Sequence, residues 1–248
     1  MSDVAQPITY PPAITVEDFA RNLDAVQARI ARAAARAGRD PRSVRLLPVS
    51  KTVAEDRLRN AVAAGYHRLG ENKVQEAKRK SENLADLDVS WAVVGHLQTN
   101  KARDVAAFAA EFQALDSLRL AEALDRRLQA AGRSLDVFVQ VNTSGEESKY
   151  GLSPDEVPAF LAALPRFETL RVQGLMTLAL FSSDLERVRA CFVRLRTLRD
   201  RARDTDPDLI GPGELSMGMS GDCVQAVEEG ATLVRVGTDI FGPRPVKS

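Results

Sequence analysis

Lys51 is the residue of this sequence whose type and position most clearly predict chemistry. The chain has seven lysines against 27 arginines, and Lys51 closely follows an apolar run at residues 44–49. A lysine that is partly buried loses hydration, which lowers its pKa and favours the neutral amine. The neutral amine is the form that attacks a carbonyl carbon. A Schiff base is the natural chemistry of such an amine. An isolated lysine at a strand end more often reaches solvent or pairs with an acid such as Glu71, so the prediction of a Schiff base depends on the residues described next.

Two glycine-containing segments near the C-terminus predict an anion site. Ser220 and Gly221 follow one apolar run, and Gly237 and Thr238 follow the next. Backbone N–H groups exposed in such loops can bind a phosphate. The same residues would also form ordinary glycine turns with a serine helix cap, so the prediction depends on the two segments occurring together.

Arg235 places a cation inside the last apolar run. Leu233, Arg235 and Gly237 alternate with Val234 and Val236, so one face of a strand here must carry a charge. An inward-facing arginine needs an acceptor, which is either an interior salt bridge or a ligand atom such as a pyridine nitrogen.

The elements that position these residues are eight short apolar runs separated by segments of helical period. The runs lie at residues 44–49, 66–70, 91–97, 112–116, 137–142, 172–177, 215–219 and 233–237. Connections of this length favour parallel strands joined by crossover helices. Eight such units in 248 residues predict a single α/β domain, a (β/α)8 barrel, rather than an open doubly wound sheet.

A further helix is predicted ahead of the first run, over residues 15–37, with Thr15 as its N-cap and Gly38 as its stop. No linker or shift in composition divides the chain. We therefore expect residues 15–248 to form the barrel domain and residues 1–14 to form a flexible N-terminus.

The barrel prediction places the chemistry at one end of the strands. In such barrels, functional side chains lie where strands run into the following helices, and those positions are polar here, whereas the strand starts show no comparable set. Pro48 lies inside the first run and lacks an N–H, so we expect a bulge or an early strand end there. We interpret His96 as a core histidine with one hydrogen bond.

Composition excludes several classes of protein. Lys plus Arg and Asp plus Glu both number 34, and this zero net charge disfavours nonspecific binding of nucleic acid. The two cysteines and two histidines lack the spacing of a zinc site or a disulfide framework, so we expect no metal and a reducing, cytoplasmic location. No apolar run approaches the ~20 residues of a membrane-spanning helix.

Five ordered motifs give the sequence a resemblance to the pyridoxal phosphate homeostasis proteins. They are residues 46–52 (LLPVSKT), 70–76 (GENKVQE), 95–101 (GHLQTNK), 218–222 (GMSGD) and 234–242 (VRVGTDIFG). The match runs from the N-terminal helix to Phe241. The resemblance implies a single-domain barrel similar to the N-terminal domain of alanine racemase and to fold-type III pyridoxal phosphate proteins, with pyridoxal 5′-phosphate as the cofactor.

The resemblance also implies roles for individual residues. Lys51 matches the lysine that holds the cofactor as a Schiff base, Arg235 matches the arginine near the pyridine nitrogen, and Asn72 matches a position near the cofactor. The loops that match the family's phosphate site are Ser220-Gly221 and Gly237-Thr238. Lys73 is a departure, because many relatives have tyrosine there, and it introduces a second amine near the barrel mouth.

The function implied is pyridoxal phosphate binding for the intracellular homeostasis of this cofactor, by buffering or delivery. Amino acids and transient apo-enzyme acceptors are the expected partners, nucleic acid and membranes are not, and the expected state is a monomer. A Schiff-base aldolase barrel that uses Lys51 without pyridoxal phosphate is one alternative.

An amino-acid racemase is the other alternative, and we expect no robust catalytic activity. A racemase needs acid and base groups on both faces of the cofactor. In racemases of this fold the second base comes from an additional β domain, whereas ten residues follow Thr238 here. An arginine beside the pyridine nitrogen also weakens the ring as an electron sink.

Overall fold

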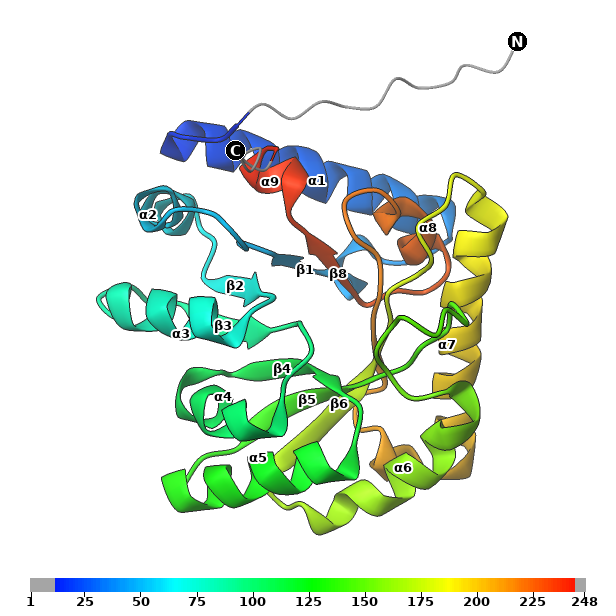
Figure 1. The fold of residues 1–248 in the computed structure, drawn as a ribbon. Helices are drawn as coiled ribbons and strands as arrows, with labels where there is room; N and C mark the ends of the chain where they lie inside the picture. Colours follow the sequence, from blue (N-terminus) through cyan, green and yellow to red (C-terminus); the bar gives the residue numbers. More distant parts are fainter. Residues whose placement is uncertain (1–11, 244–248) are drawn as a thin grey trace.

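The eight apolar runs form eight parallel strands within residues 12–243, the part of the chain that the computed structural model describes. The strands are β1 (Arg45–Pro48), β2 (Arg68–Glu71), β3 (Ser90–Val93), β4 (Glu111–Leu115), β5 (Leu135–Gln140), β6 (Leu170–Met176), β7 (Glu214–Ser216) and β8 (Leu233–Val236). Their hydrogen-bonded order is β1-β8-β7-β6-β5-β4-β3-β2. A single bridge between Val49 and Gly70 brings β1 to β2, so the predicted barrel is confirmed and nearly closed (Figure 1).

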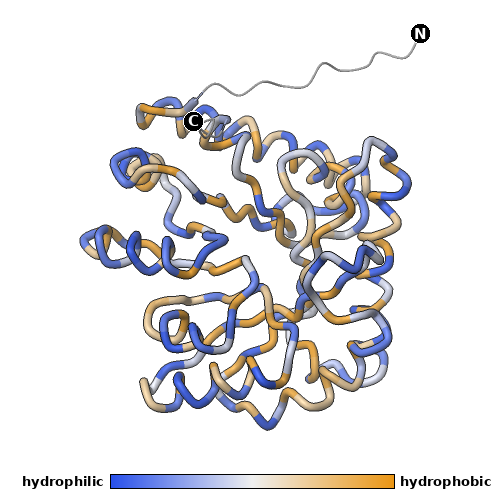
Figure 2. Tube along the Cα trace, in the orientation of Figure 1, coloured by the Kyte–Doolittle hydropathy of each residue, from blue (hydrophilic) through white to orange (hydrophobic). Residues whose placement is uncertain are grey.

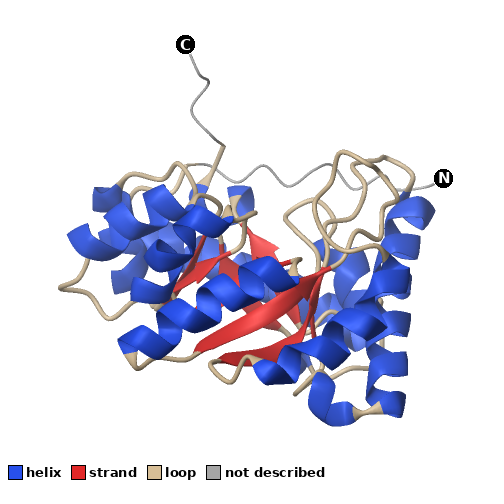
Figure 3. Ribbon diagram, turned by 60° about the horizontal axis from the view of Figure 1, so that its bottom comes forward, coloured by secondary structure: helices blue, strands red, loops and turns tan. Residues whose placement is uncertain are grey.

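Helices surround the strands on the outside, as Figure 3 shows. They are α1 (Val16–Arg36), α2 (Glu55–Ala63), α3 (Val74–Asn83), α4 (Ala102–Phe108), α5 (Leu118–Ala131), α6 (Val157–Ala163), α7 (Leu185–Thr205), α8 (Cys223–Glu228) and α9 (Thr238–Phe241). Short 3-10 turns lie at Pro41–Ser43, Thr99–Lys101, Pro154–Glu156, Leu164–Arg166 and Pro207–Leu209. Between residues 12 and 243, no helix has the length and apolar character needed to cross a membrane.

The helices form and pack because each has one apolar face. In α5, for example, Leu120, Leu124 and Leu128 recur every four residues and are buried against the strands. Figure 2 shows the consequence along the chain: the strands are mostly hydrophobic, whereas the helices alternate between hydrophilic and hydrophobic residues. The hydrophobic core therefore occupies the layer between the strands and the helices.

The predicted N-terminal helix is α1, and it begins with a capping box. The Thr15 hydroxyl accepts a hydrogen bond from the Asp18 amide at 3.2 Å, and the Asp18 carboxylate accepts one from the Thr15 amide at 3.1 Å. Farther along, the Asn22 side chain donates to the Ile240 carbonyl of α9 at 3.0 Å. Helix α1 therefore lies against α9 and supports the segment that follows β8 (Figure 1).

The early strand end predicted at Pro48 is confirmed, since β1 ends at this residue. The next amide, of Val49, donates to Val236 of β8 at 2.8 Å, and the Ser50 amide donates to Gly70 of β2 at 2.8 Å. Successive backbone N–H groups of a strand point to opposite sides, so position 48, like position 50, faces β2. The missing donor of Pro48 thus lies at the seam where β1 and β2 are joined only by a bridge.

Two strands end three or more residues before their apolar runs do. β3 ends at Val93 and β7 at Ser216, whereas the runs continue to residues 97 and 219. Gly95 lies so close to Asn72 that a Cβ there would approach its carbonyl oxygen to 2.0 Å, and Gly218 has a φ of +93°. Gly95 thus allows a close approach of the segment after β2, and Gly218 adopts a left-handed conformation that favours glycine. The polar residues that follow therefore lie in loops.

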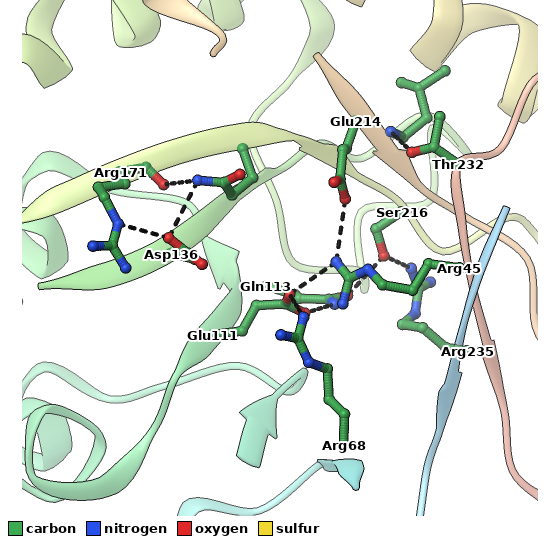
Figure 4. A network of polar contacts seen from close by, with 12 residues as sticks. Arg45, Arg68, Glu111, Gln113, Asp136, Arg171, Glu214, Ser216, Thr232 and Arg235 are labelled. Atoms are coloured by element: carbon green, nitrogen blue, oxygen red, sulfur yellow. Dashed lines mark hydrogen bonds and ion pairs between the residues drawn. The ribbon is translucent and has the colours of Figure 1, made fainter. Parts of the chain in front are cut away.

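The strand starts carry a polar cluster, contrary to the expectation from the sequence. Arg45 Nη2 lies 2.9 Å from Glu111 Oε2 and 3.1 Å from Glu214 Oε2, and Arg68 Nη1 lies 3.4 Å from the same Glu111 oxygen (Figure 4). Each of these four residues is the first of its strand, so a pattern of apolar residues gives no weight to them. Their ion pairs join the N-terminal ends of four strands.

The domain boundaries stay predictions. Residues 1–11 of the predicted flexible N-terminus and residues 244–248 of the predicted domain lie outside the described residues. Of the remainder of the N-terminal segment, Ala13 is buried, and its carbonyl accepts a hydrogen bond from Arg57 Nε at 2.9 Å.

Candidate functional site

A cavity of about 290 Å³ lies at the C-terminal ends of β1, β2, β7 and β8. This is the end of a (β/α)8 barrel at which active and binding sites occur. Every residue that the sequence predicted for the site borders the cavity: Lys51, Asn72, Ser220, Gly221, Arg235, Gly237 and Thr238. The volume is near that of pockets for small ligands. The fold therefore brings together groups that lie up to 187 positions apart in the chain.

Lys51 lines the cavity from the loop that follows β1, and the backbone beside it is strained. Thr52 has a φ of +66° and is the one non-glycine residue with a positive φ within residues 12–243. Such a conformation costs a β-branched residue on the order of 1–3 kcal/mol. The Thr52 amide donates to Glu76 Oε1 at 2.8 Å, which compensates part of this cost. The loop thus has a fixed rather than a relaxed conformation at Lys51.

A buried ion cluster that the sequence patterns did not predict lies close to the backbone on both sides of Lys51. Lys80 of α3 is fully buried, and its Nζ lies 2.7 Å from Glu71 Oε1 and 2.8 Å from Glu76 Oε1. Burial raises the pKa of Glu71, although Lys80 and Ser50 oppose this effect. For Glu76, burial is outweighed by hydrogen bonds from Lys80 and the Thr52 amide, so its pKa is lowered.

A signal for this cluster was present in the sequence. Val74, Ala77 and Lys80 recur at intervals of three and form the buried face of α3. A lysine on an apolar helix face, in a chain that has few lysines, predicts a buried partner.

Arg235 points into the barrel, with 4% of its surface exposed. Its Nη1 donates to Ser216 Oγ at 2.5 Å and its Nη2 donates to the Thr177 carbonyl at 2.7 Å. Burial lowers the pKa of Arg235 to about 10, so the side chain keeps its charge at neutral pH. Among the described residues, none of its hydrogen-bond acceptors is a carboxylate. The guanidinium therefore retains positive charge and unused N–H groups for a ligand at the cavity.

A chain of hydrogen bonds continues from Arg235 through the barrel (Figure 4). Ser216 Oγ donates to Gln113 Oε1 at 2.7 Å, and Gln113 Nε2 donates to Glu111 Oε1 at 2.5 Å. The arginine is thus held in place by a polar network that reaches the ion cluster at the opposite mouth.

The two glycine loops lie side by side, as the sequence predicted. The Gly237 amide donates to Ser220 Oγ at 3.3 Å. Within residues 12–243, the amides of Ser220 and Gly221 have no hydrogen-bond acceptor. A Cβ at position 237 would lie 3.1 Å from the Val49 carbonyl oxygen, so glycine allows the close approach of β1. The loops therefore offer a hydroxyl and two unused amides to an anion.

Asn72 and Lys73 follow β2 and differ in their relation to the cavity. Asn72 borders the cavity and is exposed. Lys73 is the N-cap residue of α3, is exposed, and is not among the residues that line the cavity within the described chain. Of these two, Asn72 is the one placed to contact a ligand.

The interpretation of His96 as a core residue is wrong. Because β3 ends at Val93, His96 lies in a loop, where its ring stacks on the exposed Tyr150 with centroids 3.8 Å apart. Its Nδ1 lies 3.5 Å from Asp116 Oδ2. Burial raises the pKa of Asp116. The stacked pair joins the loop after β3 to the loop after β5.

A second and larger hollow, of about 950 Å³, lies between α6 and α7. Apolar side chains and the stems of arginines line it, and none of the residues predicted for the site borders it. The smaller cavity at the barrel mouth is therefore the candidate site.

Comparisons with known proteins agree with this geometry. The family model described as alanine racemase, N-terminal domain, matches residues 21–245. A pyridoxal phosphate homeostasis protein of Pseudomonas aeruginosa is 43% identical over 226 residues, which cover 91% of this chain and 96% of that protein.

Two solved structures illustrate the range of the likeness. One is PipY of Synechococcus elongatus with pyridoxal phosphate bound, which is 36% identical to this chain and has a TM-score of 0.78. The match covers 90% of this chain and 100% of PipY. The other is alanine racemase of Clostridium difficile, which shares the fold alone, at 14% identity and a TM-score of 0.75. This match covers 99% of this chain and 61% of the racemase. The chain therefore belongs to the alanine racemase N-terminal domain family and, within it, to the pyridoxal phosphate homeostasis proteins.

Proposed function

We propose that this protein binds pyridoxal 5′-phosphate and serves the intracellular homeostasis of this cofactor, by buffering or delivery. The observation that carries the proposal is the cavity in which Lys51, the buried cation of Arg235 and the two glycine loops meet. An amine, a donor for a ring nitrogen and a set of anion-binding groups fit the aldehyde, the pyridine nitrogen and the phosphate of this cofactor. Membership of the family and the PipY structure support the proposal.

Lys51 would hold the cofactor covalently, because its amine borders the cavity and can form a Schiff base with an aldehyde. Ser220, Gly221, Gly237 and Thr238 hold the phosphate through hydroxyl and amide donors. When bound, the cofactor supplies a conjugated ring that absorbs near-visible light and can accept electrons.

Arg235 favours binding over turnover. Because its guanidinium is charged at neutral pH, it would disfavour a proton on a ring nitrogen bound beside it. A ring that stays unprotonated is a weak electron sink. An assay for amino-acid racemisation, and for exchange of the α-proton in deuterated solvent, separates binding from catalysis when wild type is compared with Lys51→Ala. Activity of wild type that is lost in the variant would favour the racemase alternative.

The first test of the proposal is the near-visible absorbance of protein loaded with pyridoxal phosphate, followed by borohydride reduction and peptide mass spectrometry. We expect a chromophore in wild type, its loss in Lys51→Ala, and a reduced adduct on Lys51. Failure to load the cofactor contradicts the homeostasis function and favours an aldolase-like barrel. An adduct on Lys73 instead keeps the cofactor but overturns the assignment of Lys51.

Finer aspects of the function are also proposed. Amino acids and apo-enzymes are the partners that fit an acceptor role, and we propose a monomer in the cytoplasm. Both cysteines, Cys191 and Cys223, are free thiols, which supports a reducing compartment. We further propose that the loop at residues 145–151 gates access, because Leu178 lines both the cavity and the small hollow beneath this loop.

A further inference from the structure

The ammonium group of Lys80 makes three hydrogen bonds in the interior of the protein. Its Nζ donates to the Ser50 carbonyl at 2.8 Å, to Glu71 Oε1 at 2.7 Å and to Glu76 Oε1 at 2.8 Å. An ammonium has three N–H donors, so all of them are used. The acceptors come from the loop after β1, the end of β2 and α3 itself, and Lys80 therefore ties these three elements together.

The bonds of this cluster reach both chain neighbours of Lys51. On one side, Ser50 is held through its carbonyl by Lys80 and through its hydroxyl by Glu71, with Oγ 2.6 Å from Oε1. On the other side, the Thr52 amide donates to the same Glu76 oxygen that Lys80 contacts. The strained φ of Thr52 persists only because its surroundings fix it.

The composition of the cluster indicates a role other than stability. Burying charges is costly, and a buried ion pair is commonly no more stable than well-packed apolar residues of the same volume. Lys80, Glu71 and Glu76 do not line the cavity, so within the described chain they act on a ligand only through other residues. The residue that they enclose on both sides is Lys51.

We propose that Lys80, Glu71 and Glu76 are positioning residues that fix the backbone of residues 50–52, so that Lys51 rather than another lysine meets the carbonyl of the ligand. This inference rests on the proposed function, since it assumes that Lys51 bonds to pyridoxal phosphate. It assigns a role to three residues that do not contact the cavity.

The test replaces Lys80 by methionine, which has a similar length and no charge. Lys80→Met protein is mixed with pyridoxal phosphate, and the rise of the near-visible absorbance gives the rate of C=N bond formation. We expect this rate to fall about ten- to a hundredfold, the effect of misplacing a reacting group by about 1 Å. After borohydride reduction, peptide mass spectrometry should find part of the adduct on lysines other than Lys51, a readout that a loss of stability alone does not change.

Lys78→Met is the matched control. Lys78 lies on the same helix, its Nζ is 3.0 Å from Asp104 Oδ1, and within residues 12–243 no hydrogen bond or ion pair joins it to residues 50–52. The substitution removes the same charge, and we expect both the rate and the position of the adduct to stay as in wild type.

A second pair of variants tests the same contact without removing Lys80. Glu76→Gln keeps an acceptor for the Thr52 amide and should retain most of the rate, whereas Glu76→Ala removes the acceptor and should resemble Lys80→Met. These variants decide the question if Lys80→Met fails to fold, as judged by circular dichroism.

The outcomes distinguish this inference from the function on which it rests. If folded Lys80→Met or Glu76→Ala forms the adduct on Lys51 alone and at the wild-type rate, the positioning role is overturned and the proposed function stands. If wild type itself forms no adduct with pyridoxal phosphate, both are overturned.

Discussion

At the scale of single residues, Arg235 shows how the interior of the barrel can hold a charge for a ligand. Its acceptors are a hydroxyl and a carbonyl, which satisfy part of its hydrogen-bonding capacity but do not neutralise it. Burial of a cation without a carboxylate contact is unfavourable unless another hydrogen-bond acceptor stabilises the charge. An electron-rich ring nitrogen at the cavity is such a group.

Replacing Arg235 by leucine should weaken the binding of pyridoxal phosphate about ten- to a hundredfold. A hydrogen bond from a charged donor contributes about 1.5–3 kcal/mol, and the variant loses it. Arg235→Glu should weaken binding further, because a carboxylate repels the lone pair of the ring nitrogen. Equilibrium dialysis measures the affinity, with thermal unfolding as a check of the fold. Unchanged affinity in both variants would refute contact with the ring.

At the scale of elements, specific contacts within the loop after β5 and from it to its neighbours fix its conformation. Lys149 Nζ donates to the Ala179 carbonyl at 2.9 Å, and the Asn142 side chain donates to the Glu146 carbonyl at 2.9 Å. The outer end of the loop is held by the stacking of Tyr150 on His96. Many of its other hydrogen bonds, such as those from the Asn142 side chain to the Glu146 and Lys149 carbonyls, join residues of the loop to one another, so the loop can open as a unit without unfolding the barrel.

Tyr150→Ala should accelerate the exchange of bound cofactor about two- to tenfold, because a stacked aromatic pair contributes about 0.5–1.5 kcal/mol. Tyr150 is 58% exposed, so thermal stability should change little. The rate is measured by transfer of the cofactor to an excess of an apo-aminotransferase. Phe181→Ala, which removes another exposed loop aromatic, is the control. Equal exchange rates in wild type and Tyr150→Ala would exclude gating by this contact.

The cap of α1 predicts a dependence on pH. Hydrogen bonds from the Thr15 amide, the Arg21 side chain and the Ile14 amide hold the pKa of Asp18 well below its usual value of 3.8. A lowered pKa in the folded state stabilises the protein above the unfolded value, and this contribution is lost as the pH falls below 3.8. Wild type should therefore be more stable than Asp18→Asn at pH 7.

Urea unfolding at pH 7 and at lower pH values measures this difference. It should become smaller as the pH falls below 3.8, since Asp18 of the unfolded chain then gains a proton while the folded state still favours the charged carboxylate. A difference that is the same at all pH values would show that the charge of Asp18 does not contribute to the cap.

At the scale of the whole molecule, the ion cluster that stabilises the fold and the cavity of the candidate site lie at opposite ends of the barrel. Glu111 has 3% of its surface exposed and contacts both Arg45 and Arg68, which retain access to water. The residues of the cavity lie at the other mouth. This division between a stabilising end and a functional end is a property of the barrel fold.

Glu111→Gln should lower the free energy of unfolding by about 3 kcal/mol, at the low end for a broken buried ion pair because its arginine partners are partly exposed. Asp136→Asn breaks the more exposed pair with Arg171 and should cost less than about 1 kcal/mol. Urea unfolding of the two variants measures both values. Similar small losses in the two variants would mean that the cluster does not stabilise the barrel.

The sequence by itself determined the architecture and the residues at the cavity. Eight apolar runs with helical segments between them require parallel strands, and the carboxyl ends of such strands meet at one edge. The local pattern locates each strand, and the strand's carboxyl end then identifies the residues near the cavity. Lys51, Arg235 and the glycine loops could be predicted in this way.

Only the tertiary structure decided which distant side chains share a buried charge. The contacts of Lys80 with Ser50 and Glu71, and of Glu111 with Arg45, join residues from different strands and helices. Apolar periodicity places Lys80 on the buried face of α3, but it carries no information on which side chains lie opposite it. The contribution of such buried charges to the free energy of folding depends on partners that chain folding brings within hydrogen-bond distance. The conformation of the backbone that presents Lys51 depends on the same partners.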